Sequence, residues 1–320
     1  MKFPLTMQGD TAFQTSLGLS VIINGIARFA VPFFFVISGY FWGVKQLQLG
    51  TTDWSSTRDM AMKILLIFAS WSLIYLIPFD VASLYSNGFL PELKKAYWRL
   101  LEMPIFEGTH VHLWFLPSLF RALIITSLMV SRAWHWQLFC VTVVLYIIGL
   151  LTKSYVDTPL GIHVQFNSRN GPFFSTVFFA SGYFLSIVKP TLRWFGIGLF
   201  FAVYGISLQI LETTFLRQVY GTILLQDYTV GTYFFGEGVA VAALSDQKNI
   251  RVSALARVGK LTLGIYAAHF IFVDLFHGVG NSEFGRGGIW QIAYVVLVLV
   301  SSIAIAKLMS LSALTKRFVM

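Results

Sequence analysis

The stretch "RFAVPFFFVISGYFWG" runs from Arg28 to Gly43 and decides the fold class of this 320-residue chain. After its first residue it contains no charged group, and apolar runs of about 17 to 25 residues cross a bilayer as helices. An arginine within or beside such a run is costly in lipid, so it usually faces a cavity or a partner. The stretch therefore predicts a membrane helix with a polar site on its inner face.

The composition of the whole chain agrees with this interpretation. Hydrophobic residues make up 56% and charged residues 12%, and the mean hydropathy is +0.72. Soluble domains carry roughly twice that share of charge. The net charge of +9 does not indicate a nucleic-acid partner, because the basic residues lie in short loops between apolar segments rather than in a run. Cys140, the single cysteine, lies in an apolar run and cannot form an internal disulfide.

The pattern of apolar segments predicts an all-α, polytopic membrane bundle that forms one domain over residues 1–320. The runs lack the alternation of barrel strands. We expect about nine transmembrane helices, over residues 19–43, 60–80, 112–130, 136–152, 172–188, 194–211, 228–244, 262–278 and 289–309.

The distribution of lysine and arginine predicts the orientation of these helices. Cytoplasmic loops are enriched in these residues. The side that holds the loop after the first span and the C-terminus carries more of them, including Lys45, Lys260 and Lys316. We therefore expect a cytoplasmic C-terminus, with the long loop over about 81–111 outside.

Three charged residues within the predicted spans indicate a functional interior. They are Arg28, Arg121 in "LPSLFRALIITS" and Glu237 in "YFFGEGVAVAAL". An ionisable group near the bilayer centre costs roughly 3 kcal/mol on insertion scales, so it normally faces a cavity or a partner. Two interpretations stay open. The arginines form an anion site, or they are buried pairs that orient the helices, with Glu237 as a partner.

A late apolar segment, "LGIYAAHFIFVDLFHG", carries His269, Asp274 and His277. Asp274 and His277 are three residues apart and therefore neighbours on one helix face. His269, eight residues before His277, lies close to the same face. The stripe suits proton handling or anion binding. Alternatively, His269 is a bundle histidine with its hydrogen bonds satisfied, and the other two reach water at a helix end.

The stretch "EGTHVHLWFLPSLF" places His110 and His112 directly before an apolar run. Two histidines two residues apart do not have a recognisable zinc spacing, so we expect no metal site. Trp114 is typical of a segment that enters the membrane at its interface. The chain also contains no nucleophile elbow, P-loop or HExxH motif.

The string SGYF occurs twice, at Ser38 to Phe41 and at Ser181 to Phe184. Both predicted helices run in the same direction, as they would in a parallel repeat. However, four matching letters arise easily in a chain rich in these residues, and we favour that simpler interpretation.

Three stretches together resemble the membrane acyltransferase family 3. They are "ARFAVPFFFVISGYF", "HLWFLPSLF" and "GKLTLGIYAAHFIF", in the order and approximate spacing of that family. The resemblance covers nearly all of the chain. It implies a bacterial cytoplasmic-membrane enzyme of about ten helices. Such an enzyme moves an acyl group, commonly acetyl from acetyl-CoA, to a hydroxyl of a surface polysaccharide or lipid-linked glycan.

One departure from the family pattern concerns the first helix. That helix carries an arginine followed by the histidine that is the expected catalytic base, and this chain has no match to it. We therefore expect the family's first helix to be missing, either because the true start lies upstream of residue 1 or because the gene is truncated.

The resemblance implies a role for each candidate residue. His269 is the candidate base or proton relay, and Arg28 a second catalytic group. Arg28 and Arg121 are expected to contact the CoA phosphates or the thioester oxygen, and Ser38 and Gly39 to let the CoA arm pass close to the backbone. The acceptor-binding candidates are His112, Trp114, Glu237, Asp274 and His277. Acetyl-CoA is expected as a co-substrate, with no tightly bound cofactor.

Two other classes of function remain open. Buried charges and a possible repeat are also compatible with a transporter or flippase of glycan or lipid, although paired helix interruptions are missing. The missing first helix is also compatible with an inactive remnant.

Overall fold

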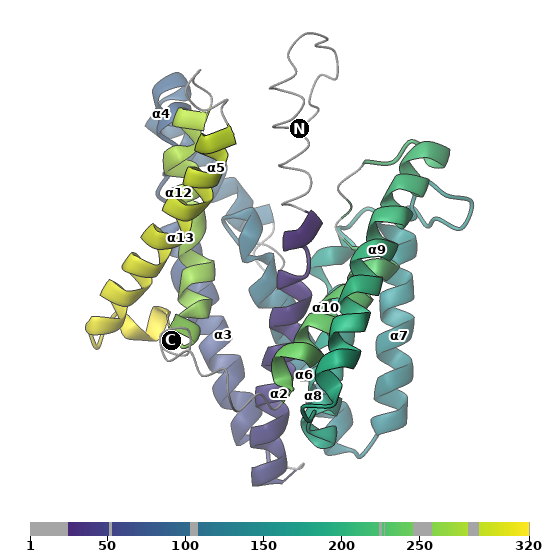
Figure 1. Cartoon of the computed structure of the whole chain (residues 1–320). Coiled ribbons are helices and arrows are strands. Elements are labelled where there is room, and N and C mark those ends of the chain that lie inside the picture. Colours follow the sequence, from purple (N-terminus) through teal and green to yellow (C-terminus); the bar gives the residue numbers. More distant parts are fainter. Residues whose placement is uncertain are drawn as a thin grey trace.

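The computed structural model describes residues 25–50, 53–102, 108–223, 226, 228–245, 258–280 and 288–319 (Figure 1). These residues form α-helices and short 3-10 turns, and no strand occurs among them. The N-terminal residues 1–24, on which the prediction of a missing first helix rests, lie outside the described residues.

The elements follow one another along the chain, and the connection between α7 and α8 is a long one that contains a single 3-10 turn. The α-helices are α2 (Ala30–Leu49), α3 (Ser55–Ile74), α4 (Val81–Asn87), α5 (Phe89–Glu102), α6 (Phe115–Ser131), α7 (His135–Thr152), α8 (Pro172–Val188), α9 (Trp194–Tyr220), α10 (Val230–Leu244), α12 (Thr262–Gly280) and α13 (Gly288–Leu311). The 3-10 turns are η1 (Val111–Trp114), η2 (Ser168–Asn170) and η4 (Lys316–Phe318).

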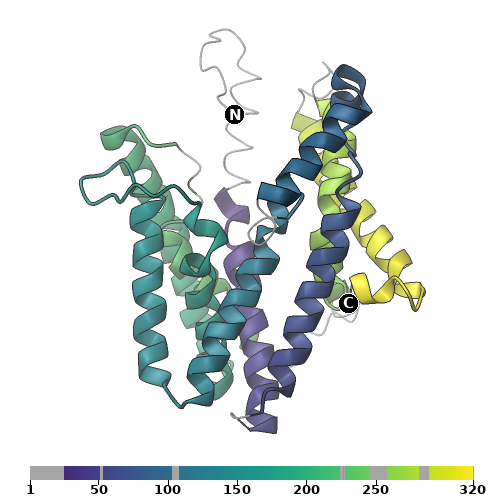
Figure 2. The ribbon, with the colours of Figure 1, turned by 180° about the vertical axis from the view of Figure 1, so that it is seen from behind.

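The long helices alternate in direction along the chain, as Figures 1 and 2 show. The α2–α3 turn lies at one end of the bundle, and α4 and α5 lie at the other. Each of the nine predicted segments contains a helix in the described part of the chain. The order of passes is therefore the one that the loops predict.

The length and hydropathy of the helices differ along the chain. Within the described residues, six helical segments are long and apolar enough to cross a membrane: Gly25–Leu49, Val111–Ser131, His135–Thr152, Ser168–Val188, Trp194–Tyr220 and Ile292–Leu311. Two more apolar helices are shorter, Val230–Leu244 and Thr262–Phe276. The start of α3 carries Arg58, Asp59 and Lys63, which lower its hydropathy. The predicted count of nine spans is thus not confirmed, whereas an all-helical membrane protein is.

The predicted outer loop over 81–111 is largely helical, which corrects that part of the sequence analysis. The Asp80 side chain accepts a hydrogen bond from the Ser83 backbone N–H at 3.0 Å and so caps α4. In α5, Lys95 pairs with Glu92 at 2.6 Å one turn away. These helices have no signal in the pattern of long apolar runs, because α4 and α5 are short and partly polar.

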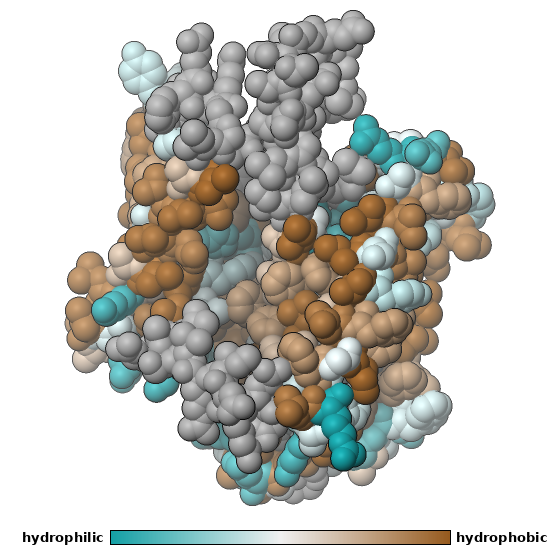
Figure 3. Space-filling view, in the orientation of Figure 1, coloured by the Kyte–Doolittle hydropathy of each residue, from teal (hydrophilic) through white to brown (hydrophobic). Residues whose placement is uncertain are grey.

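The outer surface of the bundle is apolar, as a lipid-facing surface should be. Large hydrophobic side chains are exposed along α9 and α13, for example Phe200 and Leu211 on α9 and Val300 on α13. Figure 3 shows hydrophobic residues over much of the visible face, with hydrophilic residues at its lower end and at its upper right.

Helices α2 and α8 pack closely through the two SGYF strings. A Cβ atom on Gly39 would collide with the Phe179 carbonyl, and one on Gly182 would collide with the Val36 carbonyl. Each glycine thus meets the residue three positions before the other glycine, and the two helices run in the same direction (Figure 1). The repeated letters therefore have a common physical role, which is close helix packing through small residues.

Glu212 of α9 anchors the start of α10. Its carboxylate accepts hydrogen bonds from the backbone N–H groups of Val230 and Gly231, both at 2.9 Å, and from the Tyr155 hydroxyl. A carboxylate at a helix N-terminus satisfies orphan donors and complements the helix dipole. Burial and the adjacent carboxylate together raise the pKa of the Tyr155 phenol, so this phenol stays a hydrogen-bond donor.

Replacement of Gly182 by alanine is expected to destabilise the fold, because its Cβ would force α8 away from the α2 backbone. Overpacking of this kind costs about 1–3 kcal/mol. Thermal unfolding of the detergent-solubilised protein measures the effect. The matched control is Gly196→Ala in α9, where nothing lies within 4 Å of the added methyl. Equal unfolding temperatures for the two variants would contradict the assigned packing role.

Candidate functional site

Three histidines from distant parts of the chain lie together at one end of the bundle. His110 precedes η1, His112 lies in it, and His269 lies on α12. The ring centroids of His110 and His112 are 4.9 Å apart, and those of His112 and His269 are 5.2 Å apart. The packing of η1 against α12 therefore builds a cluster that no sequence spacing reveals.

His112 is the buried centre of this cluster, with 5% of its surface exposed. Its Nδ1 lies 2.9 Å from Nδ1 of His110, and its Nε2 lies 3.1 Å from the Ala267 carbonyl oxygen. Because a carbonyl can only accept, the Nε2–H of His112 must be the donor in the second bond. The backbone of α12 thereby orients this ring.

His269 has the opposite tautomer. Its Nδ1–H donates to the Tyr266 carbonyl on the preceding turn of α12. The neutral ring therefore presents the lone pair of Nε2, for which no hydrogen-bond partner is found in the part of the chain that the structure describes. A histidine whose orientation is set by a carbonyl and whose other nitrogen is available has the geometry of a general base.

Asp274 lies five residues further along α12 and pairs with His110, with Oδ2 3.1 Å from Nε2. Both side chains are largely covered, with exposed fractions of 24% and 14%. The sequence analysis grouped Asp274 with His277 on one helix face. The His277 side chain lies outside the described residues, so that grouping is not tested.

Aromatic side chains surround the histidines. Phe270 stacks on His112 with ring centroids 4.5 Å apart. The Tyr75 hydroxyl donates to the Ala267 carbonyl at 2.7 Å, and the Tyr266 hydroxyl donates to the His112 carbonyl. These contacts fix the ring positions and keep the cluster in a mostly apolar surrounding.

A cavity of about 890 Å³ lies beside this cluster, between α2, α3, α6 and the start of α12. Its volume is in the range of ligand sites. Most of its wall is apolar, and the lining residues include Phe33, Phe34, Phe41, Trp42, Met60, Phe115, Leu119 and Leu263. Tyr266 lines the cavity and also contacts His112 and His269, so it separates the cavity from the histidine cluster.

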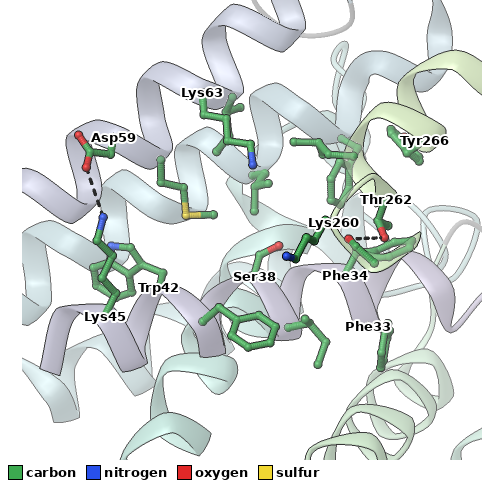
Figure 4. Close-up of a pocket in the computed structure, with 18 of the residues that line it drawn as sticks. Phe33, Phe34, Ser38, Trp42, Lys45, Asp59, Lys63, Lys260, Thr262 and Tyr266 are labelled. Atoms are coloured by element: carbon green, nitrogen blue, oxygen red, sulfur yellow. Dashed lines mark hydrogen bonds and ion pairs between the residues drawn. The ribbon is translucent and has the colours of Figure 1, made fainter. Parts of the chain in front are cut away.

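Three lysines line the same cavity: Lys45, Lys63 and Lys260. Figure 4 shows Lys63 and Lys260 reaching toward the space above Ser38 from different helical segments. Lys45 pairs with Asp59 at 3.3 Å, an exposed ion pair that contributes little stability. The sequence analysis counted these lysines only as loop charges for topology, because their convergence depends on tertiary packing.

Ser38 and Gly39 are neighbours in sequence but face different surroundings. Ser38 lines the cavity, and its place beside a CoA arm stays a prediction. Gly39 instead packs against Phe179 of α8. The space next to Gly39, where a CoA arm was expected, is therefore filled by helix α8.

Neither of the two predicted anion-binding arginines is among the cavity's lining residues. Arg28, just before α2, donates to the Gln226 carbonyl between α9 and α10. Arg121 on α6 donates to the Asn170 carbonyl at 2.6 Å. Both arginines thus hold turns of the backbone in place, and their proposed contact with CoA remains a prediction.

The remaining two candidates, Trp114 and Glu237, lie outside the cavity. Trp114 is buried rather than interfacial, with the Arg169 guanidinium 4.8 Å from its ring centroid. Glu237 on α10 accepts a hydrogen bond from Ser181, the serine of the second SGYF string. Neither lines the cavity, so acceptor binding by Trp114 and Glu237 remains untested.

No group of three or more histidine, cysteine, aspartate or glutamate side chains in the described residues has the arrangement of a metal site. The histidine cluster is held by hydrogen bonds instead.

Comparison with known proteins identifies a family and several longer relatives. A family model for an acyltransferase domain matches residues 4–310. One amino-acid racemase of Enterococcus faecalis is 28% identical over 279 residues, which cover 82% of this chain and 38% of that protein. A second is 31% identical over 174 residues, covering 50% of this chain and 23% of that protein. A serine/alanine racemase of Enterococcus gallinarum is 27% identical over 203 residues, covering 60% and 28%.

The chain thus spans between about a quarter and two fifths of the length of these curated relatives. No solved structure matches it.

Proposed function

The chain belongs to the acyltransferase 3 family, and from that premise we propose that it transfers an acyl group, most simply acetyl, from an acyl-CoA thioester to a hydroxyl. The apolar helices and the family together indicate an integral membrane protein. The acceptor we propose is a hydroxyl of a surface polysaccharide or of a lipid-linked glycan.

The observation that carries this proposal is a cavity lined by three lysines, with Tyr266 in its wall between the cavity and the histidine cluster. An acyl-CoA molecule has a phosphate-rich nucleotide joined by a thin, uncharged arm to its thioester. Lysines bind phosphate as mobile point charges. Lys63 and Lys260 would hold the phosphates, the aromatic walls would hold the arm, and Tyr266 marks where the thioester would meet the histidines.

The chemistry requires a base for the acceptor hydroxyl. His269 Nε2 is suited to accept that proton, while the hydroxyl oxygen attacks the thioester carbonyl carbon and a C–O bond forms. The C–S bond then breaks, and the proton passes from His269 to the departing sulfur. The products are an ester and free CoA thiol, so atoms and charges balance without another reactant.

The predicted orientation supports the same arrangement. The lysine-lined part of the cavity lies toward the end of the bundle where α2 turns into α3, and Lys45 belongs to that end. The excess of basic residues predicts this end to be cytoplasmic. A donor made in the cytoplasm would then enter from its own side of a bacterial cytoplasmic membrane.

The racemase names describe longer proteins, of which this chain matches at most 38% of the length. We do not propose racemase activity for this chain. Transport of glycan or lipid, and an inactive remnant, remain the outcomes against which the proposal is tested.

Substitution of Lys63 or Lys260 by glutamine should weaken the binding of CoA to purified protein about tenfold for each lysine. This magnitude corresponds to loss of one charge-assisted hydrogen bond of about 1.5 kcal/mol. Titration calorimetry in detergent measures it. Lys307→Gln, an exposed substitution on α13, is the matched control. If both the Lys63 and the Lys260 variant bind CoA with unchanged affinity, the cavity does not hold the CoA phosphates.

Substitution of His269 by glutamine should lower acyl transfer by about 100-fold or more, the usual contribution of a general base, while CoA binding is retained. The assay is transfer of radiolabelled acetyl from acetyl-CoA to surface glycan in membranes. His163→Gln, at an exposed loop position, is the control.

Normal acyl transfer by the His269→Gln variant would show that His269 is not the general base. Absence of acetyl-CoA consumption by the unaltered chain, with CoA still bound, would favour the remnant. Movement of glycan without acetyl-CoA consumption would favour the transporter.

A further inference from the structure

A line of hydrogen bonds leads from Asp274 into the bundle and is not used by the mechanism above. Asp274 Oδ2 is 3.1 Å from His110 Nε2, and the two Nδ1 atoms of His110 and His112 are 2.9 Å apart. His112 Nε2 then donates to the Ala267 carbonyl at 3.1 Å. Four groups from two segments, 164 residues apart at the first bond, are thus linked in sequence.

The hydrogens that these bonds need can be counted, starting from the Ala267 carbonyl. The Ala267 oxygen can only accept, so His112 Nε2 carries a hydrogen. The contact between two Nδ1 atoms needs one further hydrogen, on either ring. The contact between His110 and Asp274 needs another, on either the imidazole or the carboxyl. Three hydrogens are therefore required, one more than two neutral imidazoles supply.

We propose that Asp274, His110 and His112 form a proton wire that holds one shared, mobile proton. In the first arrangement the proton lies on the Asp274 carboxyl, and both rings are neutral. In the second it lies on His110, which is then a cation between the carboxylate and His112. In the third it lies on His112, whose Nδ1–H donates back to His110.

All three arrangements keep every hydrogen bond, and each has zero net charge over the trio. Moving between them requires only that one proton crosses the bond of 3.1 Å and another the bond of 2.9 Å. Rings held by stacking need not turn, since Phe270 covers His112 and Tyr75 lies 4.8 Å from His110. Such satisfied networks rigidify the structure around them.

The other ionisable groups that face the trio come from three elements. Tyr75 comes from α3, Tyr266 and His269 from α12, and Tyr294 from α13, where its hydroxyl donates to the Val273 carbonyl at 3.2 Å. Arg169, beyond Tyr266, lies over the Trp114 ring. The phenols donate to backbone carbonyls, so they leave the shared proton on the trio.

The wire also positions His269. His112 binds α12 at Ala267 and His110 binds it at Asp274, so the two bonds lie on either side of His269 along the helix. Asp274 and His110 therefore act as positioning residues. This last step rests on the proposed function, whereas the shared proton does not.

The first experiment observes the ring nitrogens directly. The whole chain, with its six histidines labelled with ¹⁵N, is studied by NMR in detergent micelles. We expect the nitrogens of His110 and His112 to show shifts between those of protonated and unprotonated nitrogen. In Asp274→Asn, which cannot hold the proton, these shifts should move to those of neutral rings. Asp157→Asn, at an exposed position, should leave them unchanged.

Unchanged shifts in a folded Asp274→Asn protein would overturn the wire. If that variant does not fold, His110→Gln replaces it, and the His112 shifts should then be those of a fixed neutral tautomer. Averaged His112 shifts in this second variant would equally overturn the proposal.

The second experiment separates positioning from the proposed reaction. Asp274→Asn should lower kcat roughly tenfold to 100-fold, as misplacement of a reacting group by about 1 Å does, while KM for acetyl-CoA stays unchanged. An unchanged kcat in Asp274→Asn would show that Asp274 does not position His269. Shared-proton signals in a protein that never consumes acetyl-CoA would sustain the wire and contradict the acyltransferase proposal.

Discussion

The contact on which the rest of the structure depends is the approach of α2 to α8 through two glycines. Gly39 and Gly182 let each helix backbone reach the carbonyl of the other, so the two helices lie closer than any pair with side chains at these positions could. In lipid, no hydrophobic effect drives helices together. Close contact between the two backbones stabilises the pair through van der Waals attraction instead. Ser38, next to Gly39, then faces the cavity, so the packing face and the site face of α2 are set together.

Polar groups inside the bundle are held largely by backbone carbonyls. Arg28 donates to Gln226, Arg121 to Asn170, and His112 to Ala267. The Gln226 and Asn170 carbonyls lie outside the long helices, where helix formation leaves carbonyls without partners, whereas the Ala267 carbonyl lies within α12 and accepts with its second lone pair. This use of the backbone explains why charges that suggest an anion site in the sequence act here as connectors between helices.

The candidate site divides its chemistry between two regions. The lysines lie toward the end of the bundle where cytoplasmic loops are expected, and the histidines lie beyond Tyr266, near the other end. Charge is thus available where a phosphate would be bound, and a base is available in an enclosed, mostly apolar place. A long, thin ligand such as an acyl-CoA would place its phosphates at the lysines and its thioester near the histidines.

The sequence by itself determined the helical membrane class and the order of the helices, and it singled out His269 as a candidate, because apolar runs and a polar group within them are local features. It also drew attention to His110 beside His112, but it did not indicate that His110 pairs with Asp274 or that the lysines share a cavity. Only the tertiary structure paired His110 with Asp274, brought Lys63 and Lys260 to one cavity, and turned Gly39 toward α8. The physical reason is that partners in a bundle are chosen by which helix faces meet, and this depends on packing between segments far apart in the chain.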